Sequence, residues 1–80
     1  MTEKETERRF AARERIVAIV SEVLEIPVSK DAVMTDIAGW DSLKTLQIVM
    51  ALDEAGYSVP LEKIAELRSV GDILSAARGP

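Results

Sequence analysis

The chain of 80 residues contains no cysteine and no histidine. Without cysteine there is no disulfide, no thiolate zinc site and no cysteine nucleophile. Without histidine there is no imidazole base near neutral pH, so the serine–histidine and cysteine–histidine mechanisms are excluded. We therefore expect a protein that is not an enzyme and that holds no metal ion.

Long apolar runs are also absent. No run approaches the ~20 residues that a membrane span needs, and no signal-peptide segment follows the charged N-terminus, so we expect a cytoplasmic protein without a membrane partner. The length predicts one domain over residues 1–80. Residues 1–9 are nearly all charged or Thr and should fray. We expect the protein to be a monomer. The initial Met and the short tail favour a free-standing protein. The net charge of −4 argues against a nucleic-acid partner.

The periodicity of apolar residues predicts helices throughout. A first helix starts near Thr6 and ends before Pro27, because proline forces the preceding residue to be extended. A long loop over residues 27–41 follows, with one helical turn after Ser29. The apolar residues of the first helix that should face the core are Phe10, Ile16, Val17, Val20, Val23 and Leu24, and those that should pin the loop are Val28, Val33, Met34 and Ile37.

A second helix should start at Asp41 or Ser42 and run to about Ala55, with Gly56 as its stop. A third should run from Pro60 to Leu67, and a fourth from Ser69 to Ala77, capped by Ser69 and Asp72. No strand alternation occurs. The fold class is therefore an all-α bundle of three main helices and one short helix. We expect the second helix to be central and to bury Leu43, Leu46, Val49 and Met50, widened by Ile48 and Leu52; the fourth should bury Val70, Ile73 and Leu74.

The segment Gly39-Trp40-Asp41-Ser42-Leu43 places one hydroxyl where a loop turns into a helix. Unpaired N–H groups and the positive end of the helix dipole suit a phosphate at such a place. Asp and Ser are also the favoured N-cap residues. Spacing alone favours capping and leaves a phosphate linkage open.

Asp41-Ser42-Leu43, followed by Val49-Met50-Ala51-Leu52-Asp53-Glu54, resembles the signature of acyl carrier proteins. The resemblance covers about Ile16 to Ala77. It includes Asp36-Ile37 before the serine, Val59-Pro60 before the third helix, Lys63-Ile64, and Ser69-Val70-Gly71-Asp72 near the end.

The resemblance implies that a phosphopantetheinyl transferase attaches 4′-phosphopantetheine from coenzyme A to Ser42. The thiol of this arm then holds an acyl group as a thioester, which fits a chain without cysteine. The implied partners are that transferase and acyl-loading and acyl-processing enzymes such as ligases, ketosynthases or acyltransferases.

The resemblance also implies roles for the neighbours of Ser42, each of which has a plain structural alternative. Asp41 would cap the helix beside the arm, and Leu43 would be an exposed contact or else a core leucine. Trp40 is interpreted as a plug that anchors the loop. The residues implied to bind partners, or else to form a solvated face, are Leu43, Lys44, Gln47, Met50, Asp53, Glu54, Glu62 and Glu66. The residues implied to line an acyl groove, or else to pack the core, are Leu46, Val49, Met50 and Ile64.

Lys44 and Gln47 occupy positions that are usually acidic in carriers of fatty-acid synthesis. They favour a carrier of specialised metabolism, most of all polyketide-type, with a fatty-acid or an aminoacyl or peptidyl carrier as alternatives. Outside the family, the alternatives are a small helical adaptor with an unmodified Ser42, and a helix-turn-helix DNA binder. The DNA binder would use the basic residues of the first helix, Arg8, Arg9, Arg13 and Arg15. This alternative fits poorly because the second helix offers Lys44 alone as a basic residue for a DNA groove.

Overall fold

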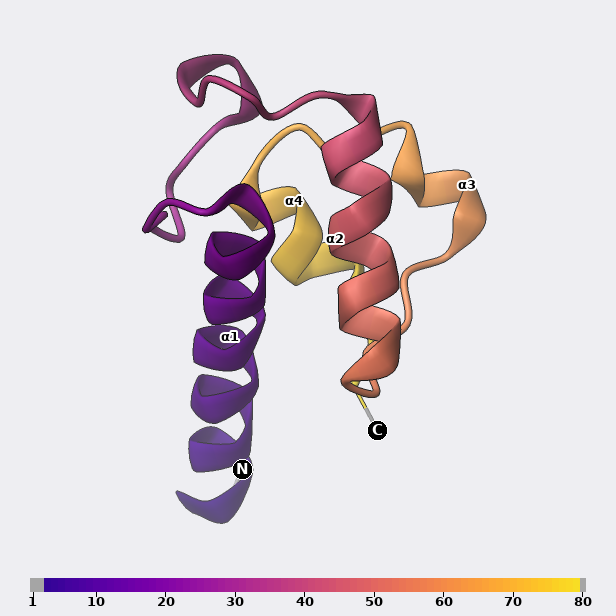
Figure 1. Ribbon diagram of the computed structural model, residues 1–80. Helices are drawn as coiled ribbons and strands as arrows, with labels where there is room; N and C mark the ends of the chain where they lie inside the picture. The colour runs from indigo at the N-terminus through magenta and orange to yellow at the C-terminus, as the bar shows by residue number, and fades with distance from the viewer. Residues whose placement is uncertain (1–2, 80) are drawn as a thin grey trace.

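The computed structural model describes residues 3–79, and the side chains of residues 10–79. Its elements are α1 (Glu3–Leu24), the 3₁₀ turn η1 (Met34–Asp36), α2 (Ser42–Glu54), α3 (Leu61–Ile64) and α4 (Val70–Ala76), shown in Figure 1. Between residues 3 and 79 there is no strand, only two isolated bridges. The predicted all-α bundle of three main helices and one short helix is confirmed.

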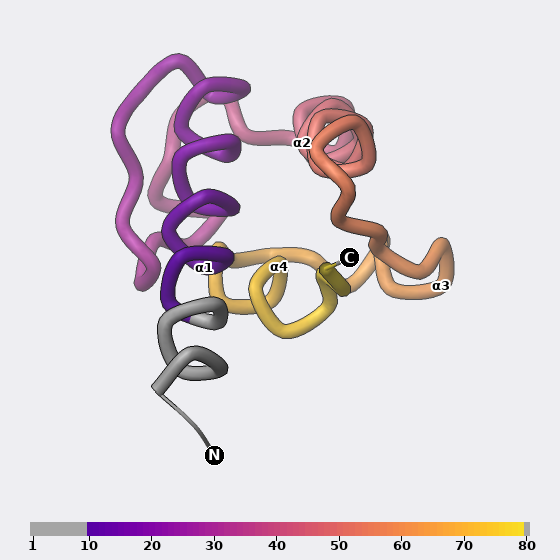
Figure 2. The backbone as a smooth tube through the Cα atoms, turned by 90° about the horizontal axis from the view of Figure 1, so that it is seen from below, coloured from indigo at the N-terminus to yellow at the C-terminus, as the bar shows by residue number. Residues whose placement is uncertain are grey.

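The helices pack around one core. α1 packs against α2 and α4, and α2 also contacts α3. Figure 2 shows α4 between α1 and α3, with α2 seen along its axis. Within residues 3–79 we find no helix with the length and apolar character needed to cross a bilayer. The core consists of Ile16, Val20, Trp40, Ile48, Leu52, Tyr57, Val59, Leu67, Val70 and Ile73.

α1 differs from its prediction at both ends. It begins at Glu3 rather than near Thr6, while the predicted fraying falls partly outside the described residues and stays a prediction. It ends at Leu24 because Glu25 adopts a left-handed backbone with φ 61°, so Pro27 is not the residue that ends it. Phe10 is 64% exposed, so its predicted burial is wrong. Figure 1 shows that the N-terminal part of α1 extends past α2.

The long connection between α1 and α2 is tied to the rest of the fold by hydrogen bonds. The N–H of Val28 donates to Ser21 Oγ at 3.1 Å. The N–H of Met34 donates to the carbonyl of Arg68 at 2.8 Å, and the N–H of Val70 donates to that of Ala32 at 2.9 Å. The connection to Ser42 is therefore held against the segment that precedes α4.

α2 ends where predicted but buries another face. Gly56, with φ 94°, donates to the carbonyl of Asp53, and Tyr57 donates to that of Leu52 at 2.8 Å, which is a Schellman end. The predicted stripe is wrong for three of its residues, since the side chains of Leu43, Leu46 and Met50 are exposed and Val49 is half-buried. The buried residues of this helix are Thr45, Ile48 and Leu52.

α3 is shorter than predicted, and α4 is close to its prediction. α3 ends at Ile64, and a tight turn follows in which the N–H of Leu67 donates to the carbonyl of Ile64 at 3.2 Å. Leu67 is nevertheless buried. At the start of α4, Ser69 Oγ accepts from the N–H of Asp72 at 3.0 Å, as the capping pattern predicts. The Asp72 carboxylate accepts from the N–H of Arg68 rather than from that of Ser69.

Candidate functional site

Ser42 is the first residue of α2 and is exposed. The residue before it provides the cap, because Asp41 Oδ1 accepts from the N–H of Lys44 at 2.9 Å. The carbonyl of Asp41 accepts from the N–H of Thr45 and so starts the helix. Asp41 therefore performs the capping that was the structural alternative for Ser42. The Ser42 hydroxyl has no hydrogen-bond partner among the described side chains.

A buried tryptophan fixes the loop that leads to Ser42. Trp40 is 5% exposed, and its Nε1 donates to Thr45 Oγ1 at 2.9 Å. The Thr45 hydroxyl in turn donates to the carbonyl of Asp41 at 3.1 Å. Gly39, with φ 88°, makes the turn before it in a conformation that favours glycine. This anchor holds Trp40 inward and leaves Ser42 outward, and it confirms the interpretation of Trp40 as a plug.

A pocket of about 510 Å³ lies beside Ser42, between α2, α3 and the segment before α4. It brings together Ser42 and two of the four residues predicted for an acyl groove, Leu46 and Ile64. The other two do not line it: Val49 packs against the core and Met50 is 66% exposed. The pocket also takes residues that the sequence interpretation did not place there, namely Met34, Thr45, Leu61, Ala65, Leu67 and Arg68.

The side of α2 turned away from the core is partly apolar, and we call it the outer face of α2. Leu43 is 62% exposed, which excludes its reading as a core leucine. Lys44 is half-buried and lies off this face. Leu61 at the start of α3, 83% exposed, is an apolar residue that the sequence interpretation missed. The outer face consists of Leu43, Leu46, Gln47, Met50, Asp53 and Glu54.

The predicted acidic residues are exposed, and the two on α2, Asp53 and Glu54, lie at the other end of that helix from Ser42. Asp53 lies about 17 Å along the helix axis from Ser42, at about 1.5 Å per residue. On α3 and the turn after it, Glu62 is exposed and Glu66 lies 3.6 Å from Lys63 in an exposed pair that contributes little stability. Across the part of the chain that is described, no three acidic side chains come together as they would around a metal ion.

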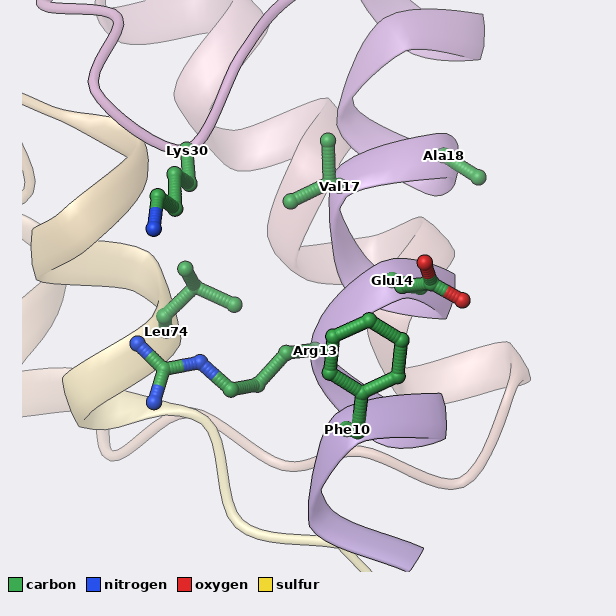
Figure 3. Close-up of a pocket in the computed structure, with 7 residues that line it drawn as sticks. All are labelled: Phe10, Arg13, Glu14, Val17, Ala18, Lys30 and Leu74. Carbon is green, nitrogen blue, oxygen red and sulfur yellow. The ribbon is translucent and has the colours of Figure 1, made fainter. Parts of the chain in front are cut away.

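A second, larger groove of about 630 Å³ lies between α1, α4 and the loop, and Figure 3 shows its lining. Arg13 and Lys30 reach toward Leu74 from opposite sides, while Phe10 stands on α1. None of the predicted site residues lines this groove, and no hydroxyl side chain lines it. Of the arginines considered for DNA binding, Arg13 lies here, and the side chains of Arg8 and Arg9 lie outside the described residues.

Comparison with known proteins adds one match. A family model described as a phosphopantetheine attachment site matches residues 14–77, a range that contains most of α1 and all of α2, α3 and α4. No curated protein and no solved structure matches the chain. The matched range agrees with the helical bundle and includes the exposed serine at the start of α2. The chain therefore belongs to the phosphopantetheine attachment-site family, as a carrier domain of the acyl carrier protein type to which 4′-phosphopantetheine is covalently attached.

Proposed function

We propose that Ser42 carries the 4′-phosphopantetheine arm, and that the arm tethers acyl intermediates as thioesters and shuttles them between biosynthetic enzymes. The observation that carries this assignment is the placement of Ser42. Its hydroxyl is exposed at the first position of α2, and Asp41 performs the capping in its place. A transferase can reach this oxygen without breaking a hydrogen bond of the fold.

The start of α2 also suits the phosphate that the attachment brings. Lys44 and Thr45 already donate their N–H groups to Asp41. The N–H groups of Ser42 and Leu43 have no backbone acceptor within residues 3–79. Free N–H groups at the positive end of a helix favour an anion.

The chemistry of attachment needs little from this chain. The Oγ–phosphorus bond forms at Ser42 as the pyrophosphate bond of coenzyme A breaks, and adenosine 3′,5′-bisphosphate leaves. The transferase supplies the base that takes the hydroxyl proton, since this chain has no histidine. What the chain contributes is position: an accessible hydroxyl at the end of a loop anchored by Trp40.

The outer face of α2 is the proposed contact surface for the transferase and for acyl-loading and acyl-processing enzymes. Its exposed apolar side chains give contact area, and Asp53 and Glu54 at its far end attract basic surfaces. Gln47 in the middle of the face is uncharged, and Lys44, which lies off the face in the first turn of α2, reduces the acidic character beside Ser42. This charge pattern supports a carrier of specialised metabolism, polyketide-type or loading another small acyl unit, rather than the fatty-acid carrier.

Intact-mass spectrometry tests the attachment. After incubation with coenzyme A and a promiscuous phosphopantetheinyl transferase, we expect the mass to increase by one phosphopantetheine, and Ser42→Ala to abolish the increase. Ser75→Ala, which removes another exposed serine, is the matched control and should gain the same mass as the unaltered chain.

Two outcomes would contradict the assignment. An increase that persists in Ser42→Ala would place the arm on another residue. An unchanged mass, under conditions that modify a known carrier, would favour the alternative of a helical adaptor with an unmodified Ser42.

A further inference from the structure

The groove between α1, α4 and the loop has no part in the proposed attachment at Ser42. Among the described residues, none from α2 lines it, and it shares no lining residue with the pocket beside Ser42. Figure 2 shows α4 between α1 and α3, so the groove lies on the α1 side of α4 and the pocket on the α3 side. A molecule held in the groove would therefore leave Ser42 and the outer face of α2 uncovered.

The floor of the groove is apolar and recessed. Val17 of α1 and Leu74 of α4 line it, are half-buried and pack against the core. Phe10 stands beside this floor on α1 and is 64% exposed (Figure 3). The two other aromatic residues of the chain, Trp40 and Tyr57, are buried. An exposed aromatic ring next to an apolar groove is typical of a surface that contacts another protein.

Two cations flank the floor. Figure 3 shows the guanidinium of Arg13 and the ammonium of Lys30 on either side of Leu74, and the carboxylate of Glu14 turned away from both. Among the described side chains, the ion pair that forms is on α3 and the turn after it, and it uses neither cation. The chain as a whole has a net charge of −4. An occupant that carries carboxylates beside its apolar side chains is complementary to this arrangement.

The shape of the groove favours an α-helix as the acidic occupant. Its lining on α1 runs from Phe10 to Ala18, about 12 Å at about 1.5 Å per residue, or just over two helical turns. A helix in such a groove makes contact through apolar residues at i, i+3 or i+4, and i+7. A flat bilayer does not reach a recessed floor, and the phosphates of a nucleic acid would leave the floor unfilled. A second copy of the chain would bring the same two cations to the contact.

We propose that this groove docks an amphipathic helix of a partner protein, with apolar residues at i, i+3 or i+4, and i+7 and with carboxylates beside them. The apolar side chains of that helix fill the floor beside Phe10, and its carboxylates pair with Arg13 and Lys30. The partner then holds the chain from the α1 side while Ser42 stays accessible. This inference does not depend on the attachment at Ser42.

Titration of the ¹⁵N-labelled chain with a defined peptide tests the proposal at low salt, where exposed charges are least screened. The probe is a synthetic helical peptide with leucines at i, i+4 and i+7 and glutamates at the flanking positions. Its twin carries lysines in place of the glutamates. We expect the glutamate peptide to shift the backbone amides of Val17, Lys30 and Leu74 and to leave those of Leu46 and Gln47, on the outer face of α2, in place. The lysine peptide should bind about tenfold more weakly.

Charge reversal of the chain should exchange the preference between the two peptides. Arg13→Glu with Lys30→Glu should weaken binding of the glutamate peptide by about tenfold and strengthen binding of the lysine peptide. Arg15→Glu with Arg78→Glu is the matched control, because it changes the net charge equally at exposed residues that do not line the groove. This control should keep the preference of the unaltered chain.

The exposed ring gives a second, uncharged test. Phe10→Ser should weaken binding of the glutamate peptide, and its far-UV circular dichroism should match that of the unaltered chain because the ring is outside the core. Ile26→Ser, at an exposed apolar residue that does not line the groove, is the matched control and should bind the peptide as the unaltered chain does.

Each other result overturns the proposal. No shift with the glutamate peptide, equal affinity for the two peptides, or equal losses in the two charge variants would remove the charge complementarity. Shifts confined to Leu46 and Gln47 would place the peptide on α2. Shifts of the groove amides that depend on the concentration of the chain alone would assign the groove to a second copy. Co-sedimentation with phosphatidylglycerol vesicles, without binding of the peptide, would assign it to a membrane surface.

Discussion

Among the described residues, Thr45 is the polar residue whose side chain is buried. Its hydroxyl forms hydrogen bonds with two neighbours. It accepts from the indole of Trp40 and donates to the carbonyl of Asp41. The loop before α2 and the first turn of α2 are thus joined at one atom. Every buried side-chain nitrogen and oxygen within residues 10–79 has a partner, so the loss of this hydroxyl would leave the indole N–H unsatisfied.

We predict that Thr45→Val, which keeps the shape and removes the hydroxyl, lowers the free energy of unfolding by about 1–3 kcal/mol. The cause is the buried N–H of Trp40, which loses its acceptor. Urea denaturation monitored by circular dichroism measures the change. In a Trp40→Phe background, where there is no N–H to satisfy, the same substitution should cost clearly less. Equal costs in the two backgrounds would contradict the coupling.

At the level of the helices, the sequence predicts where α2 and α4 lie and that Ile48 and Leu52 are buried, but it is wrong about the burial of Leu43, Leu46 and Met50. Both Leu43-Leu46-Met50 and Thr45-Ile48-Leu52 recur at helical spacing, and an apolar count favours the first set. The contact of α2 with α1 buries the second set. The sequence contains no local sign of this choice, because both sets fit one face of a helix and only the packing against α1 distinguishes them.

The site was predictable to the extent that it depends on local chemistry. The cap at Asp41 and the exposed start of α2 follow from residue types, and the resemblance directs attention to Ser42. Arg68 and Met34 could not be placed beside Ser42 from the sequence. They come from distant segments that meet through the hydrogen bond between the N–H of Met34 and the carbonyl of Arg68.

The cap of α4 gives a prediction at the same scale. Ser69→Ala removes the acceptor of the Asp72 N–H and should lower the free energy of unfolding by about 1 kcal/mol, within the range of about 0.5–2 found for such caps. Ser75→Ala on the same helix removes an exposed serine away from the cap and should change it by less than about 0.5 kcal/mol. Thermal or urea unfolding of the two variants compares them directly. A cost for Ser69→Ala no larger than that for Ser75→Ala would contradict the role of the cap.

For the whole molecule, the positions of the charged residues matter more for the approach of a partner than the net charge does. Ser42 stands at one end of the outer face of α2, and the acidic pair Asp53 and Glu54 stands at the other. Under the proposed function, a partner attracted to that pair would be aligned along the helix rather than drawn directly to the hydroxyl. Electrostatic attraction of this kind acts mainly on the rate of association.

We predict that Asp53→Lys with Glu54→Lys slows transfer of phosphopantetheine more at low salt than at high salt. The screening length falls from ~30 Å at 0.01 M salt to ~3 Å at 1 M, so the effect of the reversal should shrink as salt increases. The initial rate of transfer at several salt concentrations measures it.

Glu25→Lys with Asp31→Lys is the matched control, because it changes the net charge equally in the exposed loop before α2. We expect a smaller effect of this pair at low salt. Equal slowing by the two pairs would reduce the effect to net charge, and slowing that does not depend on salt would exclude electrostatic attraction as the cause.

The burial of Trp40 has an optical consequence. It is the one tryptophan of the chain, and it is anchored to the first turn of the helix that begins with Ser42. Under excitation selective for tryptophan, the emission of the protein therefore comes from a single indole next to the proposed attachment residue. Attachment of the arm at Ser42 would therefore be followed through this intrinsic fluorophore, without adding a label to the chain.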